Sequence, residues 1–131
     1  MIKLLLDTDY LIDYLRGQLA AKELVANIRK RRIEGYLSVI SLYELYIGMT
    51  PTSEAQKKLQ EILTMKNWFF TLILGEQAMY QAAKTHQYLK SKNRTVTVKD
   101  IFIAATAISH NLPLKTRNKK DFQHIPELKL A

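Results

Sequence analysis

The chain has 131 residues and a formal net charge of +8, with 20 Lys and Arg against 12 Asp and Glu. This length fits one domain, and its 47% hydrophobic and 24% charged residues argue against disorder, collagen-like repeats and coiled coils. The chain has no cysteine, which excludes disulfides, thiolate metal sites and cysteine nucleophiles. A pI near 9.7 favours a polyanionic partner, and nucleic acid is the first candidate.

No segment is typical of a leader peptide or of a membrane span. The opening apolar run, residues 2–6, is too short for either and is followed at once by Asp7. No other apolar run reaches the roughly 18 residues that a span needs. Together with the lack of cysteine, these features predict a cytoplasmic protein with one domain over residues 1–131 and no membrane partner.

Apolar runs and helical periodicity alternate along the chain. The predicted elements are, in order, a strand at 2–6, helices at 10–15 and 19–32, a strand at 36–40, helices at 42–49 and around 59–63, a strand at 68–74, helices at 76–90 and 98–111, a strand at 113–116, a turn or short helix at 118–122 and an edge strand at 128–130. Asp9 and Ser41 are predicted N-caps, Gly17 and Gly35 are predicted breaks, and Pro51–Ser53 separates two helices.

This alternation predicts an α/β fold with a mainly parallel central sheet flanked by helices. Residues 98–111 are apolar on nearly every face, which indicates a buried helix. In such folds ligands bind beyond the carboxyl ends of the strands. Side chains that follow strand ends are therefore the first candidates for a site.

Four acids stand out because of where they fall. Asp7 follows the first strand, Glu44 interrupts an apolar helix, and Asp100 begins the buried helix. Asp121 lies just past the strand at 113–116. A carboxylate in apolar surroundings is costly unless hydrogen bonds or a cation compensate. Parallel topology brings such element ends to one edge of the sheet, so we expect these acids to gather there.

Each acid also has a purely structural interpretation. Asp7 can cap a turn, and Glu44 can lie on an exposed stripe of its helix. Residues 97–100 match the capping-box pattern, and residues 118–121 repeat its spacing. Spacing alone leaves both interpretations open, and the joint position of the acids is what favours function.

Carboxylates gathered in a cleft repel one another unless a cation is bound. An all-oxygen carboxylate site suits Mg²⁺ or Mn²⁺. Zinc is disfavoured, because the chain lacks cysteine and its histidines have polar neighbours: His86, His110 and His124. Mg²⁺ facing a phosphodiester can activate water and stabilise the leaving oxygen. Basic runs at residues 29–32, 90–99 and 115–120 suit the flanking phosphates, or are solvated surface.

The same residues resemble a known family. The stretches that resemble PIN domains are Leu5-Leu6-Asp7-Thr8-Asp9, Ser41-Leu42-Tyr43-Glu44-Leu45, Asp100-Ile101-Phe102-Ile103-Ala104-Ala105-Thr106-Ala107 and residues 112–122. Length and motif order resemble the VapC toxins of toxin–antitoxin pairs. The resemblance covers essentially the whole chain and implies a PIN-like three-layer fold.

The resemblance also implies a function: a Mg²⁺-dependent endoribonuclease toxin that cleaves RNA phosphodiesters by metal-activated water. It implies tRNA or ribosomal RNA as substrate, a cognate antitoxin as inhibitor, and a homodimer. The metal and catalytic roles fall on Asp7 and Asp100 as principal ligands, with Glu44 and Asp121. The residues that would orient these ligands are Thr8, Asp9, Thr116 and Asn118. Some PIN domains carry an acid where this chain has Asn118, so either Asn118 or Asp121 completes the set.

An apolar groove for the antitoxin is expected at the helices of residues 42–49 and 59–63, near Trp68. The alternative is that these residues are core. Self-association could use the same region or the long helix that follows.

Rival functions fit the sequence less well. A phosphoreceiver domain needs an Asp after the third strand, where this chain has Leu74-Gly75-Glu76. A nucleotide-binding enzyme needs a glycine-rich phosphate loop, and none is present. The serious alternative is a catalytically silent PIN-like module that binds RNA or protein, and the retained acids argue against it.

Overall fold

The computed structural model describes residues 1–49 and 53–131. The strands are β1 (Ile2–Leu6), β2 (Ile33–Ser38), β3 (Phe70–Leu72) and β4 (Leu114–Lys115), and the helices are α1 (Thr8–Leu15), α2 (Leu19–Arg29), α3 (Val39–Ile47), α4 (Ala55–Lys66), α5 (Glu76–Ser91), α6 (Val98–Ser109) and α7 (Lys119–Phe122). The predicted break at Pro51 and Thr52 falls outside the described residues.

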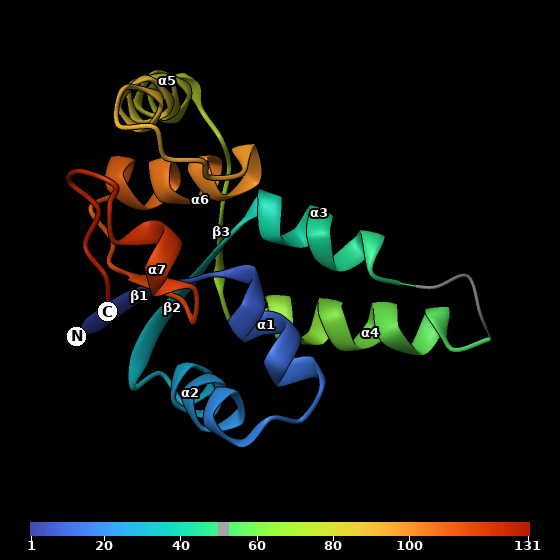
Figure 1. The fold of residues 1–131 in the computed structure, drawn as a ribbon. Coiled ribbons are helices and arrows are strands. Elements are labelled where there is room, and N and C mark those ends of the chain that lie inside the picture. The colour runs from blue at the N-terminus through green and yellow to red at the C-terminus, as the bar shows by residue number, and fades with distance from the viewer. Residues whose placement is uncertain (50–52) are drawn as a thin grey trace.

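A parallel sheet of order β3-β2-β1-β4 lies between two layers of helices (Figure 1). Helices α5 and α6 cover one face, and α1, α2 and α4 lie on the other. The α/β prediction with a mainly parallel, helix-flanked sheet is therefore confirmed. None of the helices in residues 1–49 and 53–131 combines the length and the apolarity needed to cross a bilayer.

The central strand β1 supplies apolar side chains to both layers. Successive side chains of a strand point to opposite faces of the sheet. Leu5 accordingly packs in the core with α5 and α6, whereas Leu4 and Leu6 pack with α1, α2 and α4. All three are buried, which explains why the strand ends in three consecutive leucines.

Two helices begin earlier than predicted, because strand and helix follow one another without a loop. The N-cap of α1 is Asp7 and not Asp9, since the Asp7 carboxylate accepts the Thr8 N–H at 2.8 Å. The N-cap of α3 is Ser38 and not Ser41, since the Ser38 hydroxyl accepts the Ile40 N–H at 3.0 Å. Asp9 and Ser41 are thereby left free for tertiary contacts.

The predicted break at Gly35 is wrong, because this residue lies inside β2. A Cβ built at Gly35 would stand 2.7 Å from Cγ2 of Ile28 on α2. Gly35 is therefore a point of close contact between helix and sheet. The helix predicted to reach residue 32 ends at Arg29, and Arg31 takes a φ of 63° where the chain turns into β2.

The strand predicted at residues 68–74 is shorter and less buried than expected. Only Phe70–Leu72 pair with β2, as the edge strand of the sheet. One side of an edge strand is unpaired, and Phe70 is 51% exposed. The edge strand predicted at 128–130 is a single parallel bridge between Leu130 and Leu114.

Candidate active site

Asp7 lies where β1 meets α1 and is 95% buried, with only 5% of its surface exposed. The Thr116 hydroxyl donates to Asp7 Oδ2 at 2.7 Å, and the Thr8 N–H donates to Oδ1. Thr116 follows β4, which is the neighbour of β1 in the sheet. The carboxyl ends of two adjacent parallel strands thus fix this carboxylate from both sides.

Glu44 of α3 is connected to the same strand end through Thr8. The Thr8 hydroxyl donates to Glu44 Oε1 at 2.8 Å and also lies 2.9 Å from the Ser41 hydroxyl. Since Thr8 has one hydroxyl proton and gives it to Glu44, Ser41 donates to Thr8. The second oxygen of Glu44 lies 3.6 Å from Lys99 Nζ, at the start of α6.

Asp100 stands in the first turn of α6, whose N-cap is Thr97. The Thr97 hydroxyl accepts the Asp100 N–H at 3.3 Å, so the predicted capping contact exists. Burial raises the pKa of Asp100, hydrogen bonding with Thr97 lowers it, and the carboxylates of Glu44, Asp121 and Asp9 raise it further. Asp100 is therefore both part of a helix start and close to three other acids.

Burial is also the main reason why the pKa of Asp7 rises to about 6. The hydrogen bond from Thr116 opposes this rise, whereas the nearby charges of Asp9 and Asp100 add to it. The five acids that these contacts and charges bring together are called the acid cluster: Asp7, Asp9, Glu44, Asp100 and Asp121. They come from α1, α3, α6 and α7 and lie at the carboxyl end of the sheet.

Asp121 is the exposed member of the cluster, on the short helix α7. The predicted cap at Asn118 does not form, because the Asn118 side chain makes no hydrogen bond to the helix N-terminus. Its amide instead donates to Asp121 Oδ2 at 2.9 Å, and its backbone N–H donates to Thr116 Oγ1 at 2.9 Å. Asn118 and Asp121 thus form one hydrogen-bonded pair at the exposed edge of the cluster.

The two carboxylate oxygens of Asp9 differ, since one accepts hydrogen bonds and the other has no hydrogen-bond partner. Oδ2 accepts the Arg117 N–H at 2.9 Å and lies 3.3 Å from the Thr116 hydroxyl. Oδ1 is buried without a hydrogen-bond partner. A buried carboxylate oxygen without a partner is costly unless something else, such as a cation, meets it.

Asp13, a buried acid one turn of α1 beyond Asp9, is absent from the residues predicted from the sequence. Its Oδ2 lies 2.8 Å from Arg117 Nε. The available signal was its four-residue spacing from Asp9, which places both acids on one face of the helix.

The cluster fits a divalent cation by the chemistry of its donors. No three acidic or histidine side chains in the described parts of the chain form a ready-made metal site. One Asp9 oxygen is buried without a partner, and burial together with neighbouring carboxylates raises the pKa of Asp7 and of Asp100, so a bound cation would stabilise the ionised forms of these acids. All-oxygen donors suit Mg²⁺ or Mn²⁺. Two histidines lie elsewhere: His86 is exposed on α5, and His110 caps the far end of α6 from Asp100.

Comparison with known proteins places this geometry in a family. The profile of the PIN domain matches residues 4–128. The chain belongs to the PIN domain family. One relative, the ribonuclease VapC of Rickettsia bellii, is 35% identical over 130 residues, which are 97% of this chain and 93% of the relative.

Solved PIN-domain structures agree in fold. The VapBC2 structure from Rickettsia felis matches with a TM-score of 0.89 over 99% of this chain and 98% of that one, at 20% identity. A toxin–antitoxin complex from Klebsiella pneumoniae matches with a TM-score of 0.74 at 26% identity, over 95% and 94% of the two chains. The PIN-like three-layer fold is therefore confirmed.

Proposed function

We propose that this protein is the endoribonuclease toxin of a type II toxin–antitoxin pair and that it hydrolyses RNA phosphodiester bonds with Mg²⁺ or Mn²⁺ at the acid cluster. The observation that carries the proposal is the cluster itself, in which acids from four helices meet at one end of the sheet of a basic chain. The ribonuclease name of the Rickettsia bellii relative supports it.

Asp7 and Asp100 would be the principal metal ligands, with Glu44 and Asp121 completing the set. When bound, such a cation supplies Lewis-acid chemistry: it polarises a phosphoryl oxygen and makes water more acidic. Hydrogen bonds from Thr116 to Asp7 and from Thr8 to Glu44 orient two of these carboxylates.

The substrate is held by positive charge beside the cluster. Two lysines flank the segment after β4: Lys115 ends the strand, and Lys119 begins α7. Lysine and arginine neutralise phosphates and release counterions, so this segment suits the RNA backbone on either side of the cleaved bond. The family resemblance points to tRNA or ribosomal RNA as the substrate class.

A cleavage assay on the purified chain tests the proposal. We expect RNA cleavage with Mg²⁺ or Mn²⁺, no cleavage in excess EDTA, and loss of cleavage in Asp7→Asn and Asp100→Asn with the fold retained. Glu76→Gln, which changes an exposed acid of α5, is the matched control and should keep full activity. Full activity in EDTA or in either Asp variant would contradict the proposal, and RNA binding without cleavage would indicate the silent binding module.

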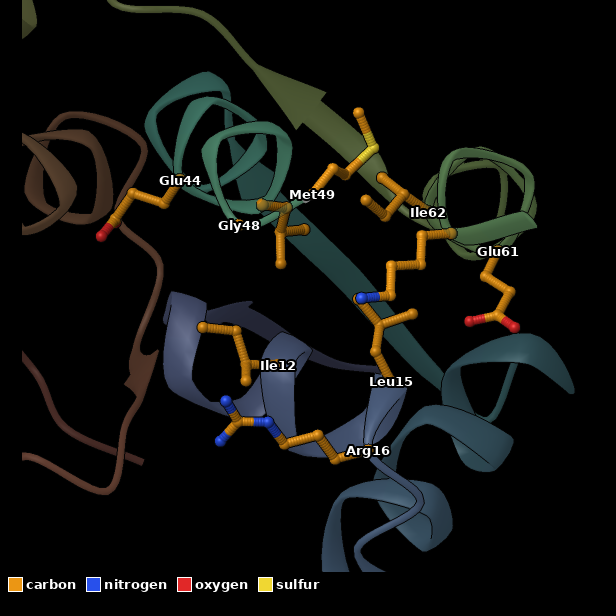
Figure 2. A pocket seen from close by; sticks show the side chains of 10 residues that line it. Ile12, Leu15, Arg16, Glu44, Gly48, Met49, Glu61 and Ile62 are labelled. Carbon is orange, nitrogen blue, oxygen red and sulfur yellow. The ribbon is translucent and has the colours of Figure 1, made fainter. Parts of the chain in front are cut away.

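We also propose an antitoxin as partner, in a groove beside the acid cluster. A cavity of about 260 Å³ lies between α1, α3 and α4. Figure 2 shows Ile12 and Leu15 of α1 opposite Met49 and Ile62, with Glu44 at one end of the groove. The predicted groove thus gains a wall from α1, whereas Leu59 and Leu63 do not line it.

A homodimer is proposed on the exposed apolar side chains around α3 and α5. Tyr43 and Ile47 are 57% and 60% exposed on α3, and Ile73 and Tyr80 are 71% and 69% exposed near α5. Exposed apolar side chains of this size are candidate contacts of a protein interface. This location agrees with the region that the sequence suggests for self-association.

A further inference from the structure

The segment between β4 and α7 is fastened to α1 by side chains outside the proposed ligand set. Arg117 is bound twice: its backbone N–H donates to Asp9 Oδ2 at 2.9 Å, and its Nε lies 2.8 Å from Asp13 Oδ2. Thr116, the preceding residue, donates to Asp7. Arg117 therefore holds the loop on which Thr116 and Asn118 stand.

The ion pair has the features of a fixed contact. Only 11% of the Asp13 side chain is exposed, against 57% of the Arg117 side chain, and Arg117 Nε lies at hydrogen-bond distance from the carboxylate. The two other ion pairs among the described residues, at Lys3 and Lys99, are longer, at 3.9 and 3.6 Å. Without Arg117, the carboxylate of Asp13 would be buried with its charge uncompensated.

We propose that the Arg117–Asp13 ion pair is a positioning device that sets the affinity of the acid cluster for its divalent cation. Asp9 and Asp13 lie one turn apart on the same face of α1. The Arg117–Asp13 ion pair therefore fixes the loop to α1 one helical turn from Asp9, a member of the acid cluster. Thr116 and the Arg117 backbone N–H then orient the carboxylates of Asp7 and Asp9. The inference rests on the proposed function, since it concerns the metal that this function requires.

A purely electrostatic role of Arg117 and a positioning role predict opposite changes in the affinity for the cation. Removing a positive charge next to acidic ligands should strengthen cation binding. Removing a positioning contact should weaken it, by roughly tenfold when the partner of a metal ligand is lost. Arg117→Gln therefore separates the two by the sign of the change.

The experiment is calorimetric titration of Mn²⁺ alone into the full chain without RNA. The variants are wild type, Arg117→Gln, Asp13→Asn, the double variant and Lys120→Gln, which removes an exposed positive charge of α7 outside the ion pair. We expect roughly tenfold weaker Mn²⁺ binding in Arg117→Gln and in the charge-neutral double variant. The double variant should lose no more than the worse single variant, because the two residues act as one unit.

Lys120→Gln should bind Mn²⁺ as well as wild type or better. Circular dichroism and the melting temperature in EDTA verify that each variant folds. If a single variant does not fold, the affinity of the double variant for Mn²⁺ is compared with that of the wild type instead. Unchanged or tighter binding in Arg117→Gln and in the double variant would overturn the positioning role while leaving the proposed function intact. No Mn²⁺ binding by the wild type would instead refute the metal-dependent function and the inference with it.

Discussion

Two opposing effects act on the carboxylate of Asp7: hydrogen bonds favour its ionised form, and burial disfavours it. As N-cap of α1 and acceptor from Thr116 it is held by hydrogen bonds that favour its ionised form. Burial nevertheless prevails and raises its pKa to about 6. A carboxylate kept in such a place without a counter-charge lowers the stability of the fold. The free energy that a bound cation would recover makes this position suited to a metal ligand.

The raised pKa of Asp7 predicts a pH-dependent stability in the absence of metal. The folded chain binds a proton at Asp7 more tightly than the unfolded chain, so stability falls as pH rises from about 4 to 6 and is then level. The loss attributable to Asp7 is about 3 kcal/mol or less. In EDTA, Asp7→Asn should remove this part of the decrease and unfold at a higher temperature than wild type at pH 7.5.

Melting curves of both proteins at pH 4, 5, 6 and 7.5 measure the difference, and the subtraction cancels groups that titrate equally in the two. Asn also serves as an N-cap, so the start of α1 is preserved. A wild type and an Asp7→Asn variant with parallel pH profiles would show that the Asp7 pKa is not raised.

Helix and strand boundaries explain where sequence reasoning succeeded and where it failed. Apolar periodicity predicted every helix and strand of the described chain to within a few residues, because each one buries a face against the sheet. It misplaced the N-caps of α1 and α3, since Asp7 alone separates β1 from α1, and Ser38 is both the last residue of β2 and the N-cap of α3. Propensity has no means of assigning one residue to both roles.

Gly35 is the clearest case of a residue whose reason is tertiary. Its type suggested a turn, but its place in β2 is dictated by the approach of Ile28 from α2. A glycine inside a strand can signal a close approach. It does not say which element approaches, because that depends on which face of α2 packs on which strand.

This contact predicts that Gly35→Ala destabilises the protein. The new Cβ would meet Cγ2 and Cδ1 of Ile28 at 2.7 and 2.9 Å, and such overpacking costs about 1–3 kcal/mol. Gly48→Ala is the matched control, because its φ of −69° is helical and its Cβ would make ordinary contacts at 3.5 Å or more. Urea unfolding should show the loss at Gly35 alone, and equal midpoints for the two variants would contradict the packing argument.

At the scale of the whole molecule, strand order decides which residues meet. The expectation that Asp7, Glu44, Asp100 and Asp121 gather at the carboxyl end of the sheet followed from parallel topology alone, and the structure brings them near one another there. The contact of Arg117 with α1 could not be predicted in this way. It exists because β4, late in the chain, pairs with β1 and not with an outer strand.

The same topology sets the groove beside the acid cluster. Glu44 belongs to both, since it accepts from Thr8 on the side of the cluster and lines the cavity between α1, α3 and α4. A partner that fills the groove would therefore stand next to the acid cluster. Under the proposed function, inhibition by a docked antitoxin would then require no change in the fold of the chain.

This arrangement predicts that Met49→Glu separates partner binding from catalysis. Met49 is half-buried, lines the groove and is not a member of the acid cluster. A charge at this position should therefore weaken the binding of an apolar partner segment roughly tenfold or more. Leu19→Glu, at the exposed start of α2, is the control. The experiment is co-expression with the product of the neighbouring gene, followed by affinity purification and a cleavage assay. Met49→Glu alone should retain less of the partner, and it alone should cleave RNA when the partner is present. Equal partner retention in the two variants would place the antitoxin on another surface, and loss of cleavage by Met49→Glu alone would show that groove and acid cluster are not separable.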